Sequence, residues 1–150
     1  MVTRDILNLK GAVIHSIAAS DSLAEAVSRM AARDIGSLVV MEGRAMCGML
    51  TFREVLQALA AFGAGFGGLA VREVMDTHPI CGAPGDTIDE LRELMTRHHV
   101  RYLPVKEHEA LVGIISFHDV AKAVIMQTDM ENRLLRRYIE SEPQAAAGQA

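Results

Sequence analysis

Two turns in the sequence combine residue types that suit nucleotide binding. They read Gly48-Met-Leu-Thr-Phe-Arg-Glu54 and Gly113-Ile-Ile-Ser-Phe-His-Asp119, and each places a hydroxyl three residues before a carboxylate. A helix that begins at such a turn offers free backbone N–H groups and the positive end of its dipole to a phosphate. The carboxylate can accept hydrogen bonds from both hydroxyls of a ribose. Each turn is therefore a candidate ligand site.

The same two turns also have a purely local interpretation. A hydroxyl at the N-cap and a carboxylate three residues later form a capping box, which stabilises a helix by about 1 kcal/mol without any ligand. A cap that occurs twice would give the same pattern in both turns. The residues alone leave both interpretations open.

Other reactive side chains favour structural roles. His98 and His99 are adjacent, and no spaced histidine pair completes a metal-ligand set. Cys47 and Cys81 form no CxxC motif, which argues against a zinc ribbon and fits a reducing cytoplasm. The glycine-rich segment 63–68 follows a predicted helix instead of a strand, so it is typical of a linker and not of a dinucleotide loop. No serine lies in a GxSxG turn, and we expect no enzyme.

Composition limits the partners. The chain has 150 residues, 15 Lys and Arg against 19 Asp and Glu, and a net charge of −4. This acidic balance and the few aromatic residues argue against nucleic acid as a partner. The first residues carry charges where a signal peptide needs an apolar core. The long uncharged stretch Val55–Val71 is shorter than the roughly 20 residues of a membrane helix, so we expect a cytoplasmic protein with no membrane contact.

The chain repeats itself. Eleven identities appear without a gap when the sequence is shifted by 65 positions, which indicates two copies of one structural unit. The residues that meet an identical partner are Asp21, Glu25, Met30, Leu38, Val40, Glu42, Ala45, Gly48, Phe52, Val55 and Ala58.

Each copy predicts the same series of elements. Capping boxes at Ser22–Glu25 and Thr87–Glu90 open helices with one apolar face. β-type runs follow at 37–41 and 46–50 in the first copy and at 102–105 and 111–115 in the second, and a second helix follows each pair. With short extended segments near 14–17 and 80–81, the unit is β-α-β-β-α. Neither unit can bury its sheet alone, so we expect the two to pack together in an α+β fold.

We predict the first repeat at residues 12–62, a glycine-rich linker at 63–73, the second repeat at 74–127, and a C-terminal helix with a frayed tail at 128–150. Within 129–140, one helical side is apolar and must be covered by the same chain or by a partner. The apolar residues of this side are Met130, Leu134, Leu135, Tyr138 and Ile139, with Arg133, Arg136 and Arg137 toward the other side.

The duplicated unit resembles a tandem pair of CBS domains, a Bateman module, as found in short stand-alone bacterial proteins. Besides the duplication, the segments Val74–Pro79, Val100–Val105 and Gly113–Asp119 carry this resemblance, which covers about residues 5–140. It implies two repeats related by a pseudo-twofold axis, with two clefts for adenosine-containing ligands such as AMP, ATP, NAD or S-adenosylmethionine.

The resemblance also implies site residues. In the second copy, Asp119 would hold the ribose hydroxyls, and Ser116 and His118 would face the phosphate or ribose. Val100 and Arg101 would line the adenine slot with Ile80. The first copy offers Thr51, Arg53, Glu54, Ile35 and Gly36. Glu54 stands where the family usually has aspartate, and its extra methylene moves the carboxylate by about an ångström or more. We therefore rank the Asp119 site first.

The sequence thus predicts a non-enzymatic sensor with no catalytic cofactor. An adenine nucleotide, AMP first, would bind between the repeats, and an unidentified protein target would sense the resulting conformational change. CBS pairs commonly dimerise, so the resemblance implies a homodimer in which the C-terminal helix caps or extends the interface. The alternative is a ligand-independent dimerisation or adaptor module, in which Thr51 and Ser116 only cap helices.

Overall fold

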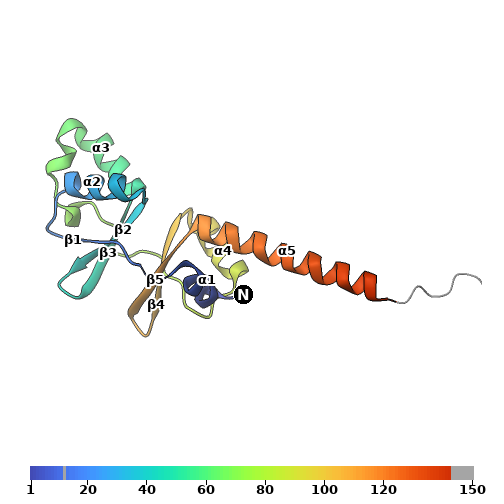
Figure 1. Cartoon of the computed structure of the whole chain (residues 1–150). Coiled ribbons are helices and arrows are strands. Elements are labelled where there is room, and N and C mark those ends of the chain that lie inside the picture. Colours follow the sequence, from blue (N-terminus) through green and yellow to red (C-terminus); the bar gives the residue numbers. More distant parts are fainter. Residues whose placement is uncertain (12, 143–150) are drawn as a thin grey trace, which may run out of the picture.

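Two lobes lie side by side in the computed structural model, which describes residues 1–11 and 13–142 (Figure 1). The first lobe contains β1 (Ser16–Ala18), α2 (Leu23–Arg33), β2 (Ser37–Glu42), β3 (Ala45–Thr51), α3 (Phe52–Phe62), η1 (Gly63–Gly68) and η2 (Val71–Glu73). The second lobe contains α1 (Thr3–Lys10), α4 (Ile88–His98), β4 (Tyr102–Glu107), β5 (Ala110–Ser116) and α5 (Phe117–Ser141). The predicted α+β fold of two repeats is confirmed.

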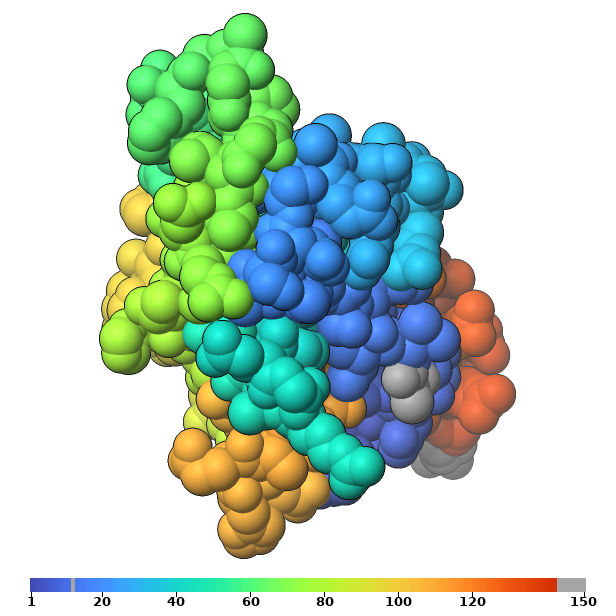
Figure 2. All heavy atoms as spheres, turned by 90° about the vertical axis from the view of Figure 1, so that its left-hand side faces the viewer, coloured from blue at the N-terminus to red at the C-terminus, as the bar shows by residue number. Residues whose placement is uncertain are grey.

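Each lobe is built on an antiparallel hairpin. In the first lobe, β2 pairs with β3, and β1 adds in parallel to β2. In the second lobe, β4 pairs with β5 alone. The extended segment predicted near 80–81 does not form a strand, because only Gly82 makes an isolated bridge, to Val105. The two hairpins otherwise match, down to register shifts at Val40 and Val105, and their tips point to one side of the molecule (Figures 1 and 2).

The predicted caps open α2 and α4, but only α4 has the complete capping box, in which the Glu90 carboxylate also accepts the Thr87 N–H at 2.7 Å. In α2 the Glu25 carboxylate instead accepts a hydrogen bond from Arg29 at 2.9 Å. The Ser22 hydroxyl accepts a hydrogen bond from the Glu25 N–H at 3.1 Å, and the Thr87 hydroxyl accepts one from the Glu90 N–H at 3.2 Å. The two helices also end alike, because Asp34 and His99 adopt the left-handed conformation with φ of 51° and 52°. Local sequence therefore sets both the start and the end of these helices.

Each lobe has its own apolar core. Burying one large aliphatic side chain contributes about 1.5–3 kcal/mol, so these matched layers account for much of each lobe's stability. Buried pairs at equivalent positions include Leu23 and Ile88, Leu38 and Leu103, Val40 and Val105, and Leu50 and Ile115.

The segments that precede the two repeats are exchanged between the lobes. α1 precedes the first repeat but packs on the second, where the Thr3 N–H donates to the Asp86 carbonyl at 2.8 Å. η2 precedes the second repeat but packs on the first, where the Val71 N–H donates to the Asp21 carbonyl at 2.8 Å. The predicted start at residue 12 leaves α1 outside the first repeat, and this exchange was not expected.

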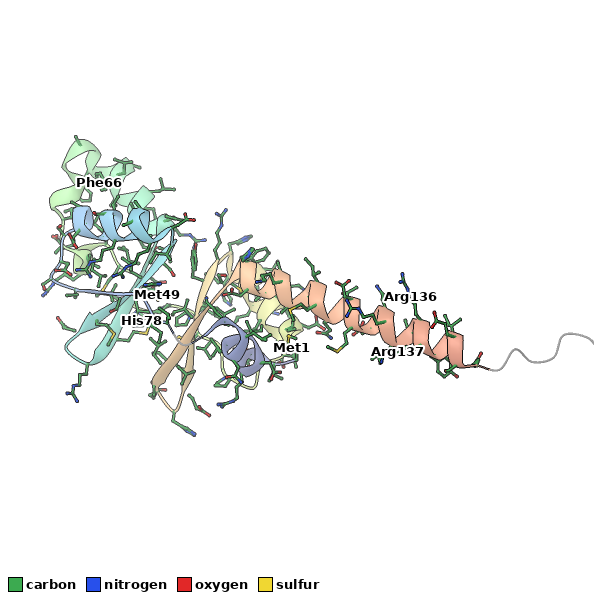
Figure 3. The ribbon with its side chains drawn as sticks, viewed as in Figure 1. Met1, Met49, Phe66, His78, Arg136 and Arg137 are labelled. Carbon is green, nitrogen blue, oxygen red and sulfur yellow. The ribbon has the colours of Figure 1, made fainter. Side chains whose placement is uncertain are left out.

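Two predicted segments differ in the structure. The glycine-rich segment predicted as a flexible linker forms the helix η1, and Phe66 packs against the first core at the outer side of that lobe (Figure 3). The second helix of the second repeat and the predicted C-terminal helix are one continuous helix, α5. α5 runs away from the second lobe, and its residues beyond Gln127 are exposed (Figure 1). Most of the predicted frayed tail, 143–150, lies outside the described residues.

Candidate functional site

A first cleft of about 360 Å³ opens between the lobes. It brings the turn after β3 against the segment before β4, so residues from both repeats face one space. From the first lobe come Met49, Thr51, Phe52, Arg53, Glu54, Leu56, Gln57 and Asp76, and they face Pro79, Ile80, Val100, Arg101 and Tyr102. Met49 lies on the side of the first lobe that faces the second (Figure 3).

The turn at the start of α3 holds the polar groups of the first cleft. One carboxylate oxygen of Glu54, Oε2, accepts hydrogen bonds from the Thr51 N–H at 2.8 Å and from the Thr51 hydroxyl. Among the described residues, the other oxygen of Glu54 has no hydrogen-bond partner. Arg53 donates across the junction to the carbonyl of His99. The turn is a helix cap, and it also presents a carboxylate oxygen, a guanidinium and the α3 N-terminus to the cleft.

A second cleft of about 470 Å³ lies on the other side of the junction. It joins Ser116 and His118, at the start of α5, with the segment before β2. Its remaining lining residues are Lys10, Gly11, Val13, His15, Asp34, Ile35, Gly36, Ser37, Arg101, Tyr102, Ile114 and Phe117. Asp119, which the sequence ranks first, is not among them.

Asp119 is engaged by α1. Lys10 Nζ lies 2.7 Å from Asp119 Oδ2, which also accepts the Ser116 N–H at 2.8 Å, and Lys10 donates to the Ile114 carbonyl at 2.9 Å. The Asp119 side chain is only 16% exposed. Burial alone would raise the pKa of Asp119, but the Lys10 and Ser116 hydrogen bonds and the Lys10 charge together lower it below its usual value. Its carboxylate borders a separate cavity beside Ile6, Leu9 and Lys122.

Tyr102 separates the two clefts. It lines both of them, and its hydroxyl lies against the backbone of Gly36, where a Cβ would come within 1.8 Å. Burial raises the pKa of Tyr102, against the lowering effect of the Arg101 charge, so the hydroxyl stays protonated at neutral pH. Arg101 also lines both clefts and occupies the position equivalent to Gly36, 65 residues away. The wall between the clefts is therefore asymmetric.

The structure divides the site residues differently from the grouping that the sequence predicts. Ser116 and His118 share the second cleft with Arg101, as expected. Ile80 and Val100, expected in the same group, lie in the first cleft with Thr51, Arg53 and Glu54. Ile35 and Gly36, expected beside Thr51, lie with Ser116 and His118. Each cleft combines the helix-start turn of one lobe with the segment before the first hairpin strand of the other lobe, because the repeats face each other across the junction.

Sequence reasoning missed Lys10, Asp76 and Tyr102. A second self-match holds the signal for Lys10: Thr3-Arg-Asp5 aligns with Val71-Arg-Glu73 at an offset of 68, outside the 65-residue frame. Equivalent hydrogen bonds confirm this alignment, since Arg4 N–H donates to the Pro84 carbonyl and Arg72 N–H to the Ala19 carbonyl, both at 3.0 Å.

In the described part of the chain, no helix is both long and apolar enough to cross a membrane.

Comparison with known proteins agrees with this architecture. The CBS domain family matches the chain twice, at residues 3–61 and 71–126. The CBS domain-containing protein YhcV of Bacillus subtilis is 32% identical over 108 residues, which are 72% of this chain and 76% of that protein.

Solved structures show the same fold. The CBS-domain containing protein ATU1752 from Agrobacterium tumefaciens has 32% identity and a TM-score of 0.79, covering 82% of this chain and 98% of that one. The CBS domain pair of MJ0100, in complex with 5′-methylthioadenosine and S-adenosyl-L-methionine, has a TM-score of 0.71 and 19% identity, covering 83% and 99%. With a matching unit in each lobe, this chain belongs to the CBS domain family.

Proposed function

We propose that the chain is a non-enzymatic regulatory module that holds an adenosine-containing ligand in the first cleft. The observation that supports this proposal is that polar side chains of one lobe and apolar side chains of the other lobe line the same cleft. Glu54 and Arg53, from the start of α3, face the apolar side chains of Ile80 and Val100 in one cavity. Sites that combine a mostly apolar slot with a few polar groups are typical of small-molecule binding.

The chemistry of a nucleoside monophosphate fits these groups. A planar base suits the space between Ile80 and Val100, and a ribose hydroxyl suits the Glu54 oxygen that the cap leaves free. A phosphate suits Arg53 and the N-terminus of α3, whereas the Thr51 hydroxyl is already donated to Glu54. We therefore reverse the order expected from the sequence and place the Glu54 site before the Asp119 site, because Lys10 already neutralises Asp119.

The relay would pass through Arg53. In the structure its guanidinium joins the first lobe to the His99 carbonyl of the second. A phosphate that binds Arg53 competes with this carbonyl, so the ligand and the inter-lobe contact favour different lobe arrangements. Such differential affinity is what a ligand needs to shift a conformational equilibrium. AMP is the first candidate ligand, and the adenosine-containing ligands of the MJ0100 domain pair support this ligand class.

Isothermal titration with AMP tests the proposal, with Glu54→Ala as the decisive variant. Losing a charge-assisted hydrogen bond costs about 1.5–3 kcal/mol, so we expect about 10- to 150-fold weaker binding. Glu90→Ala is a matched control. Glu90 makes the same capping hydrogen bond, to the Thr87 N–H at 2.7 Å, but lines neither cleft. We expect Glu90→Ala to bind AMP like the original protein.

Unchanged affinity in Glu54→Ala would contradict the site. No heat with AMP, ATP, NAD or S-adenosylmethionine would instead favour the second candidate, a ligand-independent dimerisation or adaptor module. A specific observation favours that candidate too. α3 presents an exposed apolar face at Phe52, Leu56, Leu59 and Phe62, and α5 presents one at Met130, Leu134, Leu135, Tyr138 and Ile139. In either case we propose that these faces support a homodimer.

A further inference from the structure

The two helix-start turns are equivalent in sequence but not in environment. Glu54 and Asp119 both accept the N–H of their capping residue, at 2.8 Å in each turn. Glu54 lines the first cleft, whereas Asp119 is turned to a cavity beside α1 and bound by Lys10. The difference therefore arises outside the turns, in what packs against them.

The exchanged leading segments explain this difference. α1 and η2 make equivalent backbone hydrogen bonds at their starts and then diverge. After η2, the chain pairs Asp76 with Met49 through two backbone hydrogen bonds of 2.9 Å. In the second lobe, Ile114 stands at the position of Met49, and its carbonyl accepts Lys10 Nζ at 2.9 Å instead. α1 continues for another helical turn, so a lysine side chain takes the place of a backbone bridge and reaches Asp119.

This contact changes what the second cleft can hold. Lys10 neutralises the carboxylate, and its ammonium and the Ser116 N–H both lie against Oδ2. A sugar held by both carboxylate oxygens must displace Lys10 from an ion pair that is only partly exposed, with Lys10 at 34% and Asp119 at 16%. The first cleft carries no such barrier, since no lysine lines it.

We propose that Lys10 is a specificity-determining residue that withholds Asp119 from the second cleft, so that each chain binds one nucleoside monophosphate, in the first cleft. This inference rests on the proposed function for its ligand. In this proposal α1, which lies outside both helix-start turns, determines whether one cleft or two bind ligand.

Titration with AMP tests the inference through stoichiometry. We expect one equivalent of AMP per original chain and two per chain in Lys10→Met, which keeps the apolar stem of the side chain but removes the ammonium. Adding Asp119→Ala to Lys10→Met should return the stoichiometry to one. Arg4→Met is the matched control, because it removes another α1 cation, paired with Glu107 at 2.9 Å, and should leave the stoichiometry at one.

The outcomes separate this inference from the proposed function. Two equivalents in the original protein, or one in a folded Lys10→Met, would overturn the role of Lys10 while leaving the first cleft intact. No binding to the original protein with one equivalent in Lys10→Met would support Lys10 and contradict the first cleft. If Lys10→Met does not fold, Lys10→Gln, which keeps a hydrogen-bond donor to the Ile114 carbonyl, tests the same expectation.

Discussion

At the scale of single residues, two carboxylates with the same capping role differ in function because different residues pack against them. Glu54 and Asp119 are both capping carboxylates, yet one faces a cleft and the other faces a lysine. The sequence identifies both residues and their capping role. It does not identify Lys10, because 109 positions separate Lys10 from Asp119 and no local pattern joins them. Conversely, the methylene that distinguishes Glu54 from aspartate is visible in the sequence but does not remove it from the cleft.

The lowered pKa of Asp119 predicts an acid-dependent contribution to stability. Because the pKa is lower in the folded than in the unfolded chain, the ionised carboxylate stabilises the fold above the unfolded pKa of about 4. This contribution is lost as the pH falls through the folded pKa. Urea unfolding free energies of the original protein and Asp119→Asn should therefore differ most above about pH 5 and begin to converge only as the pH falls below about 4, through the folded pKa. A difference in unfolding free energy that is independent of pH would contradict the assignment.

At the scale of elements, the sequence predicts the helices and strands that occur twice at the 65-residue offset. The helices α2 and α4 with their caps, and both hairpins, follow from local patterns that recur 65 positions apart. The match between α1 and η2 is missed at this offset because the two segments are 68 positions apart, and each packs on the opposite repeat. The pairing of turn and wall in each cleft could not be predicted either, because it depends on how the lobes face each other and not on any one element.

The segment between α2 and β2 must stay free of side-chain bulk at Gly36. A Cβ there would lie 1.8 Å from the Tyr102 hydroxyl and 2.6 Å from Phe52, so Gly36→Ala must displace the wall between the clefts. We expect a loss of about 1–3 kcal/mol in unfolding free energy, measured by urea titration. Gly85→Ala is the control, since nothing lies within 4 Å of its added Cβ. Equal stability of both variants would show that Tyr102 yields without cost.

At the scale of the whole molecule, the exposed part of α5 is the feature that most needs a partner. Leu134 is 59% exposed on a helix that has left its own lobe (Figures 1 and 3), where Arg136 and Arg137 also project. This part of α5 lies beyond residue 126, where the second family match ends. A large exposed apolar stripe of this kind marks an interaction surface.

Light scattering coupled to size exclusion tests the homodimer. We expect the original protein at twice the chain mass of 16.3 kDa and Leu134→Asp shifted toward one chain mass, because a charge in an apolar interface is costly. Asn132→Asp adds the same charge two positions away, on the other side of the helix, and should leave the dimer unchanged. A single-chain mass for the original protein at all concentrations would contradict this proposal.

The exchange of leading segments has a consequence for the order of events during synthesis. α1 ends at Lys10, yet it packs on β5 and α5, which begin only at Ala110 and Phe117. The first lobe, by contrast, receives η2 as soon as residue 73 has emerged. The first lobe can therefore close on the nascent chain, whereas α1 stays undocked until β5 and the start of α5 have been made and the contact between Lys10 and Asp119 can form.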